Sequence, residues 1–200
     1  LVGSEMCIRD RYGRYQDVDG DGIPYRTYPG THPSKGSYFT RGSSHDANAG
    51  YTEDGDIYAE VMDRLALKFK TSVRYLPEPE VSNMQKNSLG MIFFGTTTSA
   101  VKEVLDRLAK KGISLDTMRL KAFPFHPSVG SFIKNHDFIY VIEQNRDAQL
   151  KSLLKIECNA NEEKMRSILS YNGLLITAKK IEDEILASLD RAEKMGDARA

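Results

Sequence analysis

The chain has 200 residues, with 28 basic and 28 acidic side chains and no net charge at pH 7. Its length suits one domain, or one domain with an appendage, and the balanced charge excludes recruitment of nucleic acid or a membrane through bulk charge. No apolar run reaches the roughly 18 residues that a membrane helix needs. Two cysteines, Cys7 and Cys158, form neither a disulfide framework nor a CxxC metal motif, so we expect a cytoplasmic protein without a metal site.

Residues 1–11, LVGSEMCIRDR, contain no initiator methionine and resemble the translated end of a transposase sequencing adapter. We therefore leave them out of the fold argument, as one would a tag. The expectation that follows is a natural protein that extends upstream of Tyr12, of which this chain is the C-terminal part.

Residues 17–22, DVDGDG, match the opening of a calcium-binding loop. The twelfth position of such a loop is normally a bidentate Glu, whereas Tyr28 stands there, and Pro24 interrupts the segment. An Asp- and Gly-rich turn explains the same residues. The sequence therefore favours a turn over a calcium site.

Residues 12–53 form a long segment with neither helical nor strand periodicity, yet tyrosine and phenylalanine are spread through it. Long loops in compact domains are usually functional or linkers, and disordered tracts are usually poor in aromatic residues. We expect an ordered irregular loop packed against another element. Its basic and hydroxyl side chains suit an anionic ligand, although a structural connector remains an open alternative: Arg26, His32, Lys35, Thr40, Arg41, Ser43, Ser44 and His45.

A connecting helix is predicted over residues 54–72, because Ile57, Val61, Leu65 and Phe69 recur at helical spacing. Asp54 suits the positive end of that helix. Residues 73–88 contain two prolines and many polar side chains, which predicts a linker and a domain boundary.

Residues 89–190 alternate between apolar strand-like runs and amphipathic helical patterns. Strands are predicted near residues 91–94, 118–123 and 138–142, with a short helix over 127–135 and further helices around 150–154, 165–169 and 181–189. This order predicts an α/β domain of three layers, with helices on both faces of a parallel sheet. The tail, residues 191–200, is expected to fray.

Candidate site residues in this domain follow the third predicted strand. Glu143, Gln144 and Asn145 lie at the carboxyl end of that strand, where open α/β sheets place ligand or partner contacts. An interface role suits them better than catalysis, and Asn145 could equally be a helix N-cap. The turn at residues 95–99, GTTTS, lacks both glycine-rich phosphate motifs, so helix capping is the better interpretation.

The remaining histidines and the second cysteine form no recognisable catalytic set. His126 and His136 flank the short helix over 127–135 and are interpreted as capping or surface residues. Cys158 follows a helix with no histidine nearby and is interpreted as an inert thiol.

Four segments carry a specific resemblance to a known family: DVDGDGIPYRTYPGTHPSKGSYFTRGSSHD, MDRLALKF, RLKAFPF and HDFIYVIEQNRDAQLKSLL. They resemble the alpha subunit of the 2-oxoacid:ferredoxin oxidoreductases, and within that family the 2-oxoglutarate enzyme is the best match. The resemblance extends from about Tyr12 to Asp190. What the sequence lacks is everything upstream, which in this family would include the domain that completes the thiamine diphosphate site.

The resemblance implies an enzyme that oxidatively decarboxylates 2-oxoglutarate or a related 2-oxo acid to an acyl-coenzyme A, with electrons passing to ferredoxin. It implies that thiamine diphosphate, Mg²⁺ and an iron–sulfur cluster belong to a partner beta subunit, and that this fragment alone holds none of them and is inactive. By motif position, Arg26 and Thr40 resemble the family's substrate-contacting Arg and Thr. Residues 89–190 resemble the family's domain that is similar to the C-terminal domain of transketolase, a structural and interface module.

Two other classes of protein stay open at this point. One is the C-terminal domain of a different thiamine diphosphate enzyme, which would share the α/β pattern without the Arg26 loop. The other is a non-enzymatic module that binds calcium or a protein partner.

Overall fold

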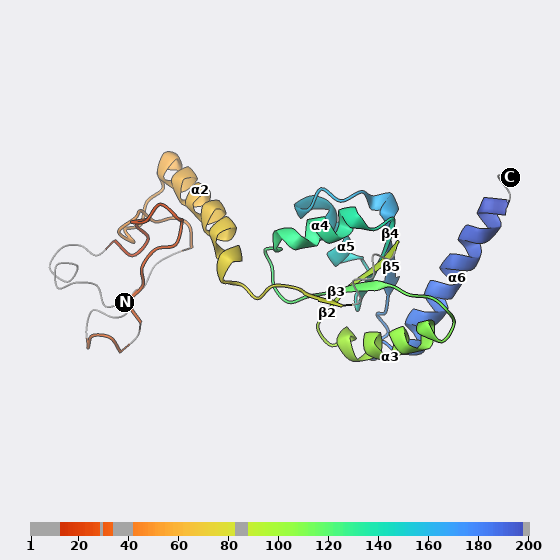
Figure 1. The fold of residues 1–200 in the computed structure, drawn as a ribbon. Coiled ribbons are helices and arrows are strands. Elements are labelled where there is room, and N and C mark those ends of the chain that lie inside the picture. The colour runs from red at the N-terminus through yellow and green to blue at the C-terminus, as the bar shows by residue number, and fades with distance from the viewer. Residues whose placement is uncertain (1–12, 29, 34–41, 83–87, 198–200) are drawn as a thin grey trace. The chain divides into compact units, whose positions relative to one another are not determined.

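A computed structural model describes residues 13–28, 30–33, 42–82 and 88–197 (Figure 1). The chain divides into two compact units, Leu1–Leu76 and Pro77–Ala200. We call them the N-terminal unit and the C-terminal domain, and each is described by itself.

Helix α2 (Gly55–Ser72) is the main regular element of the described N-terminal unit, where the sequence predicts a helix over residues 54–72. Asp54 is its N-cap, and the Asp54 carboxylate accepts hydrogen bonds from the backbone N–H groups of Asp56 and Ile57. Such a cap satisfies donors that have no partner within the helix. A short 3₁₀ helix, η1 (Val73–Tyr75), follows α2 directly.

The irregular part of the N-terminal unit is ordered by contacts of its own. His45 pairs with Tyr51 in an isolated antiparallel bridge, and the buried His45 ring stacks on Tyr15 with 3.8 Å between ring centroids. The Tyr15 N–H donates to the carbonyl of Ala47 at 3.0 Å. The described portions of the loop are therefore ordered around Tyr15 and His45. The tyrosines from which packing was predicted are exposed where the structure describes them: Tyr25, Tyr28 and Tyr51.

The C-terminal domain is built on a five-stranded sheet of order β1-β3-β2-β4-β5. Its strands are β1 (Glu80–Ser82), β2 (Leu89–Phe94), β3 (Asp116–Leu120), β4 (Phe138–Glu143) and β5 (Met165–Leu169). Strands β2 to β5 pair in parallel, and β1 is antiparallel to β3 at one edge. The predicted α/β class with a parallel sheet is confirmed.

Four helices cover the two faces of this sheet (Figure 1). Helices α3 (Thr97–Ala109) and α6 (Ala178–Asp197) share one apolar core with β2, β4 and β5, and α4 (Pro127–Asn135) and α5 (Gln149–Glu157) share the other. In β2, Met91 and Phe93 face the first core, whereas Ile92 faces the second. Strands buried on both faces are nearly all apolar for this reason, and the three-layer prediction is confirmed.

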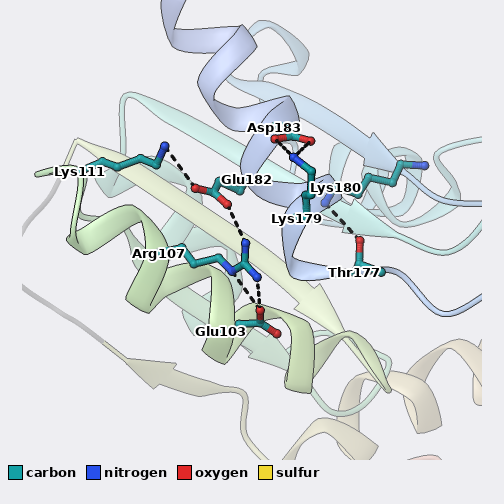
Figure 2. A network of polar contacts seen from close by, with 8 residues as sticks. All are labelled: Glu103, Arg107, Lys111, Thr177, Lys179, Lys180, Glu182 and Asp183. Atoms are coloured by element: carbon teal, nitrogen blue, oxygen red, sulfur yellow. Dashed lines mark hydrogen bonds and ion pairs between the residues drawn. The ribbon is translucent and has the colours of Figure 1, made fainter.

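An ion network ties α3 to α6 (Figure 2). Only 10% of the Glu182 side chain on α6 is exposed, and its two carboxylate oxygens lie 3.3 Å from Arg107 Nη1 and 3.5 Å from Lys111 Nζ on α3. Arg107 also pairs with Glu103 one turn earlier on α3 at 2.5 Å. Both Glu103 and Glu182 raise the pKa of Arg107, and the Glu103 hydrogen bond is the larger cause. The network fixes the pairing of two helices that are 75 residues apart in sequence.

Three segments differ from their predicted structure. Residues 165–169 form strand β5, so the helix predicted there is wrong: Met165 and Ile168 are buried in opposite cores, and their spacing of three fits a strand covered on both faces as well as a helix. Residues 73–88 contain η1 and the edge strand β1, whose three residues are all exposed and give no apolar signal. Helix α6 continues to Asp197, beyond the start of the expected tail.

Candidate functional site

The loop that precedes α2 touches that helix at Gly22. Gly22 has φ +81°, and a Cβ atom built on it would lie 2.4 Å from the backbone nitrogen of Lys68 and 2.8 Å from the carbonyl oxygen of Arg64. Contacts this short do not occur for real side chains, and the positive φ independently favours glycine. Only glycine therefore lets the loop backbone reach the helix backbone here.

Two hydrogen bonds fix the loop at the same point. The hydroxyl of Thr71 donates to the carbonyl of Asp21 at 2.6 Å, and Arg64 Nη1 donates to the carbonyl of Gly22 at 3.1 Å. Thr71 is buried in this contact. The loop is thus held along the last turns of α2, and Arg26 follows four residues after the contact.

The three aspartates of the DVDGDG turn bind groups of the turn itself. The Asp17 carboxylate accepts from the N–H groups of Asp21 at 3.0 Å and Gly22 at 2.9 Å. Asp21 accepts from the N–H of Ile23 at 2.8 Å, and Asp19 accepts from the hydroxyl of Tyr25 at 2.7 Å and so raises the pKa of Tyr25. This geometry is that of an Asx-type turn, the alternative that the sequence favoured over a calcium loop.

Arg26 is exposed, and within the described ranges no carboxylate forms an ion pair with it. Lys68 on α2 is half-buried, and its pKa is lowered, first by that burial and then by the charges of Arg26 and Arg64. We call Arg26, Arg64 and Lys68 the basic cluster. Thr40, the second predicted substrate contact, lies outside the described residues, as do Lys35 and Arg41.

The C-terminal domain has its own candidate region at the carboxyl ends of β2 and β4. The chain leaves β2 toward β3 on one side and leaves β4 toward β5 on the other, which makes this edge a topological switch point where open α/β sheets bind ligands. Gln144 Nε2 bridges the two strand ends by donating to the hydroxyl oxygens of Thr96 at 2.9 Å and Thr97 at 3.3 Å. The sequence analysis identified residues 95–99 and residues 143–145 separately, but it did not predict the hydrogen bonds between them.

Glu143 and Asn145 serve the start of α5. Glu143 is fully buried, and its carboxylate accepts hydrogen bonds from Leu150 N at 2.6 Å, Lys151 N at 3.1 Å and Asn145 Nδ2 at 2.8 Å. Asn145 Oδ1 accepts from Asp147 N at 3.1 Å and Gln149 N at 3.3 Å, but the N-cap position of α5 is Ala148 and not Asn145. An interface role for Glu143, Gln144 and Asn145 stays a prediction, and the buried Glu143 carboxylate is committed to α5.

His126 and His136 flank α4, and Cys158 follows α5. The contacts of these three residues stabilise the fold. His126 is the N-cap of α4 and accepts from the Ser128 N–H. His136 is buried against Asp116, with 3.2 Å between Nε2 and Oδ2; no sequence pattern indicated that pair. Cys158 follows α5, and burial, with Glu157 as a smaller cause, raises the pKa of its thiol. A raised pKa lowers the thiolate fraction, which fits an inert thiol.

The described ranges hold neither a candidate metal-binding cluster nor a helix that could cross a membrane. No group of three or more His, Cys, Asp or Glu side chains is placed there to hold a metal ion. None of the helices in those ranges combines the length and the apolar character that crossing a bilayer requires.

No protein-family profile and no curated protein matches the sequence. Among solved structures, the 2-oxoglutarate:ferredoxin oxidoreductase from Magnetococcus marinus, determined with 2-oxoglutarate, coenzyme A and succinyl-CoA bound, is similar over 90% of this chain, with a TM-score of 0.73 and 20% sequence identity. The similar region is 31% of that chain, so the present chain spans about a third of its length.

Two further structures are similar over 56% of this chain. One is the alpha chain of a probable 2-oxoacid ferredoxin oxidoreductase from Thermoplasma acidophilum, with a TM-score of 0.40, 22% identity and 97% of that chain covered. The other is a split-gene transketolase described as an inactive β4 tetramer, with a TM-score of 0.46, 13% identity and 42% of that chain covered. The fold is therefore similar to part of a 2-oxoglutarate:ferredoxin oxidoreductase chain, in agreement with the family that the sequence motifs resemble.

Proposed function

We propose that this chain is part of the alpha subunit of a cytoplasmic, thiamine diphosphate-dependent 2-oxoacid:ferredoxin oxidoreductase. The enzyme would convert 2-oxoglutarate or a related 2-oxo acid, with coenzyme A, to an acyl-coenzyme A and CO₂, and would pass electrons to ferredoxin. The observation that carries the proposal is the fold similarity over 90% of the chain, which agrees with the motifs that resemble the same family.

The proposal assigns thiamine diphosphate, Mg²⁺ and the iron–sulfur cluster to a partner beta subunit. Bound in the partner, the thiamine group supplies the electron sink that decarboxylation of a 2-oxo acid requires. This chain contributes substrate contacts from the N-terminal unit and an interface from the C-terminal domain, with Gln144 and Asn145 at its candidate edge.

Arg26 is proposed to bind a carboxylate of the 2-oxo acid. Arg26 is exposed, and the loop that carries it is held against α2 four residues earlier by the contacts of Gly22 with Arg64 and of Asp21 with Thr71. A planar guanidinium matches two carboxylate oxygens, which an ammonium group does not. Thr40 is proposed to add a neutral hydroxyl contact to the same end of the substrate.

The experiment is steady-state kinetics on the alpha–beta enzyme that carries Arg26→Ala, Arg26→Lys or Thr40→Val. A hydrogen bond to a charged group contributes about 1.5–3 kcal/mol, so Arg26→Ala is expected to lower kcat/KM roughly 10- to 100-fold. Arg26→Lys should recover part of the loss, and Thr40→Val should cost less than Arg26→Ala. An Arg26→Ala enzyme that melts earlier yet keeps the wild-type kcat/KM when folded would show a structural role instead.

A further inference from the structure

Lys68 and Arg64 share one face of α2, because residues four apart in a helix are neighbours on its surface. The Gly22 backbone packs on the helix between them, and the loop that continues from Gly22 carries Arg26. The fold therefore gathers three positive charges from two segments that are about 40 residues apart in sequence.

Such a gathering of like charges is unfavourable unless an anion joins it. The acidic side chains that precede Arg26 in the loop do not supply one: Asp17 and Asp21 bind backbone N–H groups, and Asp19 binds the Tyr25 hydroxyl. Across the part of the chain that the structure describes, no carboxylate pairs with any member of the basic cluster. The cluster thus has the electrostatics of a site for an external anion.

The three members of the basic cluster are not equivalent. Arg64 is anchored, since Nη1 binds the Gly22 carbonyl and its guanidinium lies 5.7 Å from the centre of the Tyr15 ring. These two contacts hold the positive charge of Arg64 in place. Among the described residues, neither Arg26 nor Lys68 has a comparable contact. The pKa of Lys68 is lowered because burial, and then the charges of Arg26 and Arg64, disfavour its protonated form.

Resting on the proposed function, we infer that Lys68 is a further substrate-binding residue, whose ammonium group binds the same 2-oxo acid carboxylate as Arg26. Arg26 supplies the planar fork that orients the carboxylate, whereas Lys68 supplies a point charge from the side of α2. Arg64 strengthens the site by its charge and by holding the loop. A bound carboxylate stabilises protonated Lys68, so ligand binding and protonation of Lys68 must reinforce each other.

The first test is binding to the full 200-residue chain. Lysines are labelled by reductive ¹³C-dimethylation, which keeps their charge, and the Lys68 signal is assigned through its loss in Lys68→Arg. Adding 2-oxoglutarate should move the pH midpoint of Lys68 upward, and the midpoint of Lys70, an exposed lysine on the same helix, should stay unchanged. Inorganic phosphate at equal ionic strength should have the smaller effect on Lys68.

The matched variants are Lys68→Gln and Lys70→Gln. Lys68→Gln should weaken 2-oxoglutarate binding about 3- to 10-fold, between the effect of an exposed ion pair and that of a charge-assisted hydrogen bond, and Lys70→Gln should leave it unchanged. Equal effects of the two variants, a fixed Lys68 midpoint, or a stronger response to phosphate than to 2-oxoglutarate would overturn the inference.

The second test separates this inference from the proposed function. In the alpha–beta enzyme, Lys68→Gln should raise KM for 2-oxoglutarate about 3- to 10-fold, and Lys70→Gln should not. A normal KM in an active Lys68→Gln enzyme overturns the role of Lys68 and leaves the proposed function standing. A wild-type complex without 2-oxo acid oxidation overturns the proposed function, and the ¹³C titration then decides on its own whether Lys68 binds the carboxylate.

Discussion

Replacing Gly22 by alanine should detach the loop that carries Arg26 from helix α2. The new Cβ would lie 2.4 Å from the Lys68 backbone nitrogen, and no rotation of a side chain can relieve a clash with backbone. The loop must therefore move, and it would lose the hydrogen bonds from Arg64 to the Gly22 carbonyl and from Thr71 to the Asp21 carbonyl. At about 1.5–3 kcal/mol for the charged donor and about 0.5–1.5 kcal/mol for the neutral one, the loss is about 2–4.5 kcal/mol.

Gly20→Ala is the matched control for this prediction. Gly20 also has a positive φ, +72°, but a Cβ built on it meets nothing within 4 Å. Both substitutions place an L-residue in left-handed backbone, which costs about 1–2 kcal/mol. Both also reduce the conformational entropy of the unfolded chain equally. The difference between them therefore isolates the packing of the loop on α2.

Hydrogen exchange of the α2 and loop amides in the full chain measures the effect, because it reports the free energy of local opening without depending on the C-terminal domain. We expect Gly22→Ala to lower that free energy by about 2–4.5 kcal/mol more than Gly20→Ala does. Equal exchange in the two variants would refute the argument that the Gly22 contact positions Arg26.

Three further predictions concern single groups. Glu143→Ala should lower the free energy of unfolding of the C-terminal domain, measured in urea, by about 2–3 kcal/mol, because α5 loses the buried carboxylate that accepts its first N–H groups. The exposed control Asp147→Ala should change that free energy by under about 0.5 kcal/mol. Equal effects of the two substitutions would contradict the capping role of Glu143. Cys158, whose thiol pKa is raised by burial, should react with iodoacetamide at pH 8 more slowly than glutathione does, and an equal rate would contradict its inertness. Arg26→Gln should raise the pKa of Lys68 toward its ordinary value but not restore it fully, since burial is the larger cause; an unchanged ¹³C titration would show that the two charges do not interact.

The α/β architecture could be predicted because buried parallel strands carry continuous apolar runs. Met91, Phe93 and Ile139 are almost wholly buried, and the helices between the strands show an apolar stripe. Strand β5 could not be distinguished from a helix, because its two buried residues are three apart and face opposite cores. The edge strand β1 has no buried face at all, and only its pairing with β3 reveals it.

The candidate site was predictable only in part. Arg26 is proposed from a motif, and its role stays a prediction. Lys68 was missed, because nothing in the helical pattern of α2 shows that a glycine more than 40 residues upstream packs beside it. The role of Glu143 was also hidden, since a carboxylate that caps a helix seven residues later is visible only when the hydrogen bonds are known.

The proposed oxidoreductase activity can be assayed on the intact subunit that contains this chain, expressed together with a candidate beta subunit. The measurement is the reduction of ferredoxin by the purified complex with 2-oxoglutarate and coenzyme A. Ferredoxin reduction should require both substrates, and its kcat/KM should fall roughly 10- to 100-fold with Arg26→Ala. A complex that binds its cofactors yet reduces no ferredoxin with any 2-oxo acid would contradict the proposed activity.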